Sequence, residues 1–350
     1  MRFSWLSVTG LGGLCVGFAG VGSTGSLAPV SDVARIVWSR TLSPPPSYVS
    51  DALVWKDSLV VADRGESALR LYGTNGKASA EMVGAHRNRG GLVGFVLIAA
   101  DGDRLFALSK RRALISLTLP SLQVDGEQPT DLAGGAGRFL AFDSKLVLVG
   151  VGSRAQEGPM DFVWSENQDL VPAGRKALWT IDESVRRFVD LVYTPLACRT
   201  PEGQVAAVRP DRLQMALINT GSGSNGLYEL APPPGYRLRV RPMPAFVPSQ
   251  RGEYLAWRAE ASYLAGVSCS ARGLTILRGE GVGSQTSWFA DTYSYDGKAQ
   301  ASFPLPIKAA RVVPLNSGCV DCVEVLTIQG DSMDLGTEHT WVRYAPPAAR

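Results

Sequence analysis

Short apolar runs separated by polar turns fill most of the chain. The clearest series is Ala52–Trp55, Leu59–Ala62 and Ala68–Tyr72, followed across Asn75-Gly76 by residues 77–83. Short runs bounded by turn residues are typical of β-strands, whereas helices show an apolar repeat of about 3.6 residues. The pattern therefore predicts four β-strands between residues 52 and 83.

The same order of run, turn and run returns five more times along the sequence. The later units begin near Phe95, Phe139, Val205, Tyr254 and Ala310. In the third unit the third apolar run is delayed to residues 177–181, so we interpret residues 152–176 as an insertion. A four-strand unit that recurs about every 45–55 residues is typical of a β-propeller.

The sequence thus predicts an all-β fold, a β-propeller of six four-stranded blades, or of seven if residues 160–200 hold a further blade. We expect a signal peptide over residues 1–26, an N-terminal strand and Pro-rich linker over 27–46, one propeller domain over 47–346 and a tail over 347–350. A strand expected at residues 33–38 is placed to complete the last blade and close the ring, which leaves only short sheet edges exposed.

A nine-residue pattern occurs twice in the predicted propeller. Tyr72-Gly-Thr-Asn-Gly-Lys-Ala-Ser-Ala80 matches Tyr293-Ser-Tyr-Asp-Gly-Lys-Ala-Gln-Ala301. Asn-Gly and Asp-Gly favour the positive φ angles of a two-residue type I′ turn. We expect each copy to join the third strand of a blade to the fourth, far from the central channel, with Lys77 and Lys298 solvated.

These hairpins and the stretch Asp57-Ser-Leu-Val-Val-Ala-Asp63 resemble the exported six-bladed β-propeller proteins of bacteria, the NHL-like and TolB-like group. The repeat pattern shared with this group covers most of residues 47–345. The residues themselves match closely only in the first and fifth units. The Asn-His-Leu signature of the NHL repeat does not occur in the sequence, nor do the WD40 and kelch signatures. The resemblance implies an extracytoplasmic propeller.

The N-terminus agrees with export. Arg2 precedes an apolar, glycine-rich stretch from Phe3 to about Gly22, and the next charged residue is Asp32. This order is typical of a secretory signal peptide. An uncleaved membrane anchor is the alternative, although a spanning helix needs about 20 strongly apolar residues. We expect a secreted or periplasmic protein with no membrane span after the leader is removed.

Four cysteines remain after the leader: Cys198, Cys269, Cys319 and Cys322. An even number in an oxidising compartment favours disulfides, and four cysteines allow three pairings. We favour Cys198 with Cys269 and Cys319 with Cys322. The Cys-Val-Asp-Cys spacing could also belong to a redox motif or half of a zinc site, but its strand-like flanks favour a structural disulfide across a turn.

The charge pattern excludes one class of partner. The formal net charge is +3 over 350 residues, and without a basic stripe with interleaved aromatic residues nucleic acid is not an expected partner. Arg237, Arg239 and Arg241 alternate along one expected strand face. That face is either simply solvated, as in many antiparallel sheets, or a small anion-binding stripe.

Signatures of catalysis are scarce. After the leader the chain has two histidines, His86 and His339, both expected at the surface, and it has no Gly-x-Ser-x-Gly elbow for a Ser-His-Asp triad. Glu157-Gly-Pro159, followed by Trp164, resembles the first strand of lactonase-type propellers, in which the glutamate ligates a divalent cation. Glu157 is therefore a weak candidate metal ligand, with an ordinary loop as the alternative, and no cofactor is expected.

Together these features favour an exported binding or scaffold module. Its protein or carbohydrate ligand would contact one end of the propeller, where loops lie on a rigid frame. Candidate binding residues are Trp164, Arg237, Arg239 and Arg241, and residues 152–176 are a candidate partner-facing segment. The alternative is a propeller-type metal-assisted hydrolase or lactonase, or a lyase, which predicts Asp, Glu or Asn side chains that converge at the channel.

Overall fold

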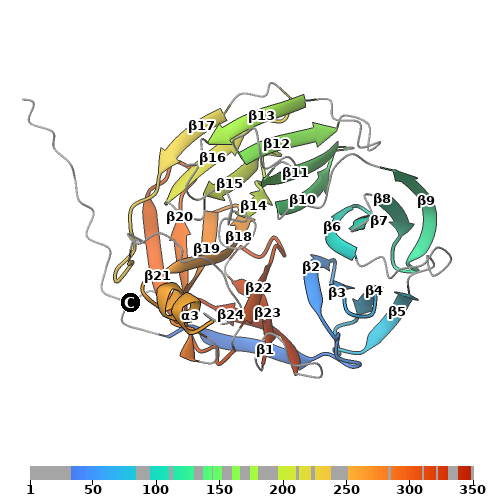
Figure 1. Cartoon of the computed structure of the whole chain (residues 1–350), viewed down its shortest axis with the longest axis horizontal. Helices are drawn as coiled ribbons and strands as arrows, with labels where there is room; N and C mark the ends of the chain where they lie inside the picture. The colour runs from blue at the N-terminus through green and yellow to red at the C-terminus, as the bar shows by residue number, and fades with distance from the viewer. Residues whose placement is uncertain are drawn as a thin grey trace, which may run out of the picture.

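The structure is a computed structural model. It describes residues 33–83, 95–109, 113–129, 137–143, 145–151, 160–165, 174–179, 196–209, 213–221, 225–237, 251–282, 285–309, 311–320, 322–329 and 338–347. The described strands form six four-stranded antiparallel sheets (Figure 1).

The first three sheets follow the chain in simple order. They contain β2 (Val49–Trp55), β3 (Ser58–Asp63), β4 (Ala68–Tyr72) and β5 (Ala78–Val83); β6 (Phe95–Asp101), β7 (Arg104–Ser109), β8 (Ala113–Thr118) and β9 (Gln123–Pro129); and β10 (Gly137–Phe142), β11 (Lys145–Val151), β12 (Met160–Ser165) and β13 (Gly174–Trp179).

The last three sheets complete the ring. They contain β14 (Leu196–Arg199), β15 (Val205–Arg209), β16 (Gln214–Ile218) and β17 (Asn225–Glu229); β18 (Tyr263–Ser270), β19 (Gly273–Glu280), β20 (Ser287–Tyr293) and β21 (Ala299–Leu305); and β22 (Arg311–Leu315), β23 (Val323–Ile328), β24 (His339–Ala345) and β1 (Arg35–Thr41).

The first strands of neighbouring sheets lie side by side around the centre. β2 contacts β6, and the contacts continue through β10, β14, β18 and β22 back to β2. The predicted all-β β-propeller is therefore confirmed. Since strands alternate in direction within each sheet, the turns after the first strands lie at one end of the ring, here called the first-turn end. The linkers between sheets lie at the other, the linker end.

The N-terminal strand completes the last sheet, where the sequence placed it. β1 pairs with β24 from Arg35 opposite Ala345 to Thr41 opposite Thr340. The ring of Trp38 packs edge-on against Trp341, with 4.8 Å between the ring centroids. The Arg40 guanidinium lies over Trp38, 3.9 Å from its centroid. The first and last described strands thus form one sheet.

The core is divided among the interfaces between sheets. In the first sheet β4 is buried along its whole length, whereas the outer strand β5 alternates between half-buried and exposed residues. One cluster between the first and second sheets includes Val60, Leu69, Ile98 and Ile115. Strands covered on both faces need continuous apolar runs, which is why the middle strands are so evident in the sequence.

The insertion predicted over residues 152–176 is wrong where the structure describes it. Residues 160–165 are β12 and residues 174–179 are β13, the third and fourth strands of the third sheet. Among the described residues of 160–200, the next strand, β14, opens the fourth sheet. These residues do not form a separate seventh blade.

Two other assignments need correction. The run that begins at Val205 is the second strand of its sheet, because the short strand β14 precedes it. Tyr254–Trp257, expected as a strand, lies in the helix α3 (Arg251–Ala259). A four-residue apolar run fits either element, and Glu253 in the first turn favours the helix electrostatically.

The repeated hairpins have the predicted location but a different turn. They join β4 to β5 and β20 to β21. Only the glycines have positive φ angles, 76° for Gly76 and 86° for Gly297, whereas a type I′ turn needs two successive positive φ values. The Gly73 amide donates to the Lys77 carbonyl at 3.0 Å, so the loop is longer than two residues. The predicted type I′ turn is therefore wrong.

Candidate functional site

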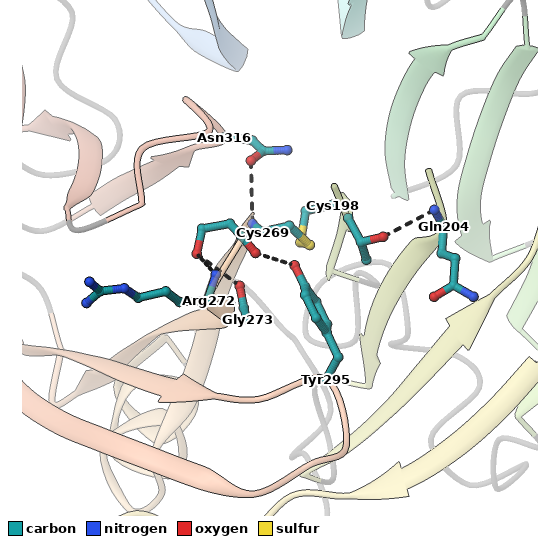
Figure 2. The surroundings of a disulfide bond; sticks show 9 residues. Cys198, Gln204, Cys269, Arg272, Gly273, Tyr295 and Asn316 are labelled. Carbon is teal, nitrogen blue, oxygen red and sulfur yellow. Dashed lines mark hydrogen bonds between the residues drawn. A yellow bond between two sulfur atoms is a disulfide. The ribbon is translucent and has the colours of Figure 1, made fainter. Parts of the chain in front are cut away.

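A disulfide joins two neighbouring inner strands at the first-turn end. Cys198 of β14 is bonded to Cys269 of β18, with 5.6 Å between their Cα atoms (Figure 2). The Cys269 amide donates a hydrogen bond of 3.4 Å to the side-chain oxygen of Asn316, which follows β22. Three successive sheets are therefore connected directly beside the centre of the ring.

Further contacts at the first-turn end join other neighbours. The indole N–H of Trp55 donates to the Gly102 carbonyl at 2.7 Å, which links the first sheet to the second. The Arg199 guanidinium lies 3.1 Å from the Asp143 carboxylate, which links the fourth sheet to the third. The Arg199 pair is exposed and contributes little stability, so the disulfide and the buried packing hold this end together.

The second disulfide lies in the turn between β22 and β23. Cys319 and Cys322 are bonded to each other, three residues apart. Both cysteine pairings are those that the sequence analysis favours. Val320, between the two, is 46% exposed. This disulfide stiffens a surface loop, whereas the first one links two sheets.

At the linker end, Asp51 connects three inner strands. Its carboxylate is buried on β2, accepts a hydrogen bond of 3.0 Å from the Ile98 amide of β6 and forms an ion pair with Arg138 of β10. A buried carboxylate needs such partners, because removing them would leave an uncompensated charge. Asp51 thus fixes the spacing of the first three sheets.

Asp63, fully buried at the end of β3, organises the neighbouring loops. Its carboxylate accepts hydrogen bonds from the amides of Ser47 at 2.7 Å and Tyr48 at 3.0 Å and from the Arg70 guanidinium at 2.8 Å. Burial alone would raise the pKa of Asp63, but its hydrogen bonds, led by those from the Ser47 and Tyr48 amides, together outweigh burial, so the net pKa lies below its usual value.

Sequence reasoning did not select Asp51, Asp63 or Arg70 as site residues. The available signal in the sequence was a charged residue within an apolar strand. Charged side chains are rarely buried unless they are paired, so such a residue indicates a partner. Asp51 has partners 47 and 87 residues away, and Asp63 binds mainly backbone amides, so the pattern alone did not bring these groups together.

Of the predicted binding residues, the structure describes Trp164 and Arg237, which lie in different parts of the ring. The backbone of Trp164 lies in β12, opposite Val147 and Gly174. Arg237 lies in the linker after β17 instead of on the expected strand, and its guanidinium is 4.0 Å from the Glu280 carboxylate. Glu157, Arg239 and Arg241 lie outside the described residues, as do most of residues 152–176.

The predicted surface position can be checked for one of the two histidines. His339 begins β24 and is only 2% exposed, so the expected surface position is wrong for it. His86 lies outside the described residues. Within the described ranges, no three His, Cys, Asp or Glu side chains are grouped so that they could hold a metal ion.

Comparisons by sequence give no family for the chain. No family model matches it, and no curated protein sequence is significantly similar. Across the described parts of the chain, none of the helices combines the length and hydropathy needed to cross a membrane.

Solved structures show the propeller fold at low identity. A member of the DUF4221 family from Bacteroides vulgatus aligns with a TM-score of 0.57 at 9% identity, covering 89% of this chain and 97% of that one. The U3-55K structure aligns with a TM-score of 0.54 at 8% identity, covering 87% and 98%. The calcium-binding protein regucalcin from Agrobacterium tumefaciens aligns with a TM-score of 0.50 at 14% identity, covering 89% and 95%. At these identities the likeness concerns the fold alone.

Proposed function

We propose that this protein is an exported β-propeller that acts as a binding or scaffold module. The observation that carries the proposal is that neighbouring inner strands are joined directly to each other at both ends of the ring. The Cys198–Cys269 disulfide holds one end, and the carboxylate of Asp51 holds the other. Loops on such a frame are positioned before a ligand arrives, which reduces the ordering cost of binding.

The proposed location is secreted or periplasmic. The two cysteine pairs at bonding distance support an oxidising compartment, and the expected leader over residues 1–26 would deliver the chain there. Expression of the full chain in a bacterium with a periplasm tests this proposal. We expect the recovered protein to lack the leader and to contain no free thiol by alkylation. Recovery from the cytoplasm with four reactive thiols would contradict it.

Binding and catalysis are separable by experiment. The purified exported protein would be assayed for bound metal, for stabilisation by Ca²⁺, Mg²⁺ or Zn²⁺ in thermal unfolding, and for hydrolysis of lactone and ester substrates. We expect no cation-specific rise in the melting temperature and no turnover, and we expect a protein or carbohydrate ligand to raise it by mass action. A rise with one cation, together with turnover, would establish the enzyme instead.

A further inference from the structure

Two arginines from different sheets lie over one exposed aromatic ring at the linker end. Tyr48 immediately precedes β2 and is 40% exposed. The guanidinium carbon of Arg64, after β3, lies 5.9 Å from its ring centroid, and that of Arg311, at the start of β22, lies 5.4 Å away. The group therefore spans the junction where the last sheet meets the first.

Neither guanidinium is neutralised by a carboxylate within the described part of the chain. Arg64 is exposed and Arg311 is half-buried, and the contacts of both guanidinium groups are with Tyr48. Other arginines of the protein are paired with acids: Arg70 with Asp63, Glu66 and Glu81, Arg278 with Glu280 and Asp291, and Arg343 with Glu324. Arg64 and Arg311 differ from these in sharing one aromatic ring with no carboxylate partner among the described residues.

The backbone holds this group in place without a ligand. The Arg64 amide donates a hydrogen bond of 2.8 Å to the Tyr48 carbonyl. On the other side the Tyr48 amide donates to the buried Asp63 carboxylate. Because Asp63 anchors the linker and the following turn together, Tyr48 and Arg64 keep their separation whether or not anything is bound.

The chemistry of the group favours carboxylates. A guanidinium stacked on an aromatic face keeps its N–H donors in its own plane, free to bind a carboxylate through two parallel hydrogen bonds. Pro44 and Pro45, both exposed, lie just before Tyr48 in the chain and supply apolar surface. Charge and apolar surface together match an extended peptide with acidic and apolar side chains.

We propose that Arg64, Arg311 and Tyr48 form a binding site for the carboxylate side chains of an acidic peptide segment in a partner protein. This inference rests on the proposed binding function and adds the class of partner and the end of the ring that it contacts. It does not require Arg237 or Trp164, the residues expected from sequence.

Fluorescence anisotropy on the full chain tests the site. The probe is a fluorescein-labelled ten-residue peptide of alternating Glu and Val, titrated at low salt. We expect R64Q/R311Q to weaken binding by roughly tenfold or more, because hydrogen bonds between charged groups are the strong ones. The matched control, K77Q/K298Q, removes the same charge from two exposed hairpin turns and should bind within about twofold of the parent. Both double variants should melt at the parent temperature.

The other outcomes are equally informative. Tyr48→Phe should retain the affinity and Tyr48→Ala should lower it, since the ring orients the guanidinium groups. Equal weakening in R64Q/R311Q and K77Q/K298Q would overturn the proposal in favour of general electrostatics. Displacement of the peptide by inorganic phosphate at equal concentration would overturn it in favour of a simple anion site. If the parent protein does not bind the peptide but is stabilised by another protein or by a carbohydrate, this site is wrong and the binding function stands.

Discussion

The hydroxyl group of Tyr72 donates a hydrogen bond of 2.8 Å to the carbonyl oxygen of Pro44. Tyr72 ends β4 of the first sheet, and Pro44 lies in the linker that enters this sheet from β1. In the fifth sheet Tyr293 makes the equivalent bond, 3.0 Å long, to the carbonyl of Ala231 in the linker from β17. The repeated tyrosine therefore attaches these two sheets to the linkers that precede them.

Removing either hydroxyl should weaken the ring. Tyr72→Phe and Tyr293→Phe should each lower the free energy of unfolding by about 1 kcal/mol, since a hydrogen bond from a buried tyrosine is lost. Tyr344→Phe is the control, because Tyr344 is buried but its hydroxyl has no polar partner in the described residues. Urea denaturation measures all three, and equal losses would show that the hydrogen bonds themselves contribute nothing.

The glycine of the first hairpin should resist substitution. Gly76 has a φ of 76°, and a Cβ added there would lie 2.3 Å from the Thr41 carbonyl oxygen on β1. Gly102 also has a positive φ, 58°, but open space around it. The left-handed conformation costs a non-glycine residue about 1–2 kcal/mol at both positions. Gly76→Ala should lose more of the free energy of unfolding than Gly102→Ala, because it also displaces β1. Chemical denaturation of the two variants measures both losses. Equal losses would mean that the clash with Thr41 is relieved without cost.

The two disulfides should differ in their contribution to stability. Cys198 and Cys269 are separated by 71 residues, and Cys319 and Cys322 by three. By loop-closure entropy, replacing the first pair with serines should cost about 4 kcal/mol and replacing the second about 1.5 kcal/mol. Chemical unfolding of the two double variants tests this order. If replacing Cys319 and Cys322 costs more of the free energy of unfolding, the disulfide in the surface loop is the more important one for stability.

The low pKa of Asp63 makes stability depend on acid. The folded state holds this pKa below its ordinary value of 3.8. The carboxylate therefore stabilises the fold fully above that value, and this contribution is lost as the pH falls through the folded-state pKa. Asp63→Asn should therefore be less stable than the parent by about 2–3 kcal/mol at pH 7, from lost charged hydrogen bonds. The difference should shrink below about pH 4. A constant difference across this range would mean that packing and not charge is responsible.

Burial explains which parts of the fold could be predicted. The second and third strands of a sheet are covered on both faces, so runs such as Leu59–Ala62 are continuous and unambiguous. Outer strands face solvent, and β9, with the sequence Gln-Val-Asp-Gly-Glu-Gln-Pro, has the composition of a loop. The strand expected at Tyr254–Trp257 is part of the helix α3. A four-residue apolar run is too short to distinguish the helical period from the strand period.

The proposed site could not be read from the sequence for a different reason. Tyr48 and Arg311 are at opposite ends of the propeller sequence and meet because the last sheet lies beside the first. Arg64 alone resembles any exposed turn residue. The predicted stripe of Arg237, Arg239 and Arg241 had a visible spacing, whereas a site assembled by ring closure has none.

The pairing of β1 with β24 also imposes an order on folding. β1 precedes every other described strand, yet its neighbour within the sheet is β24 (residues 339–345), the last described strand. The ring must remain open until β24 is available, and contacts this distant in sequence form slowly. In the exported protein that we propose, the last sheet would be completed only after β24 has crossed the membrane.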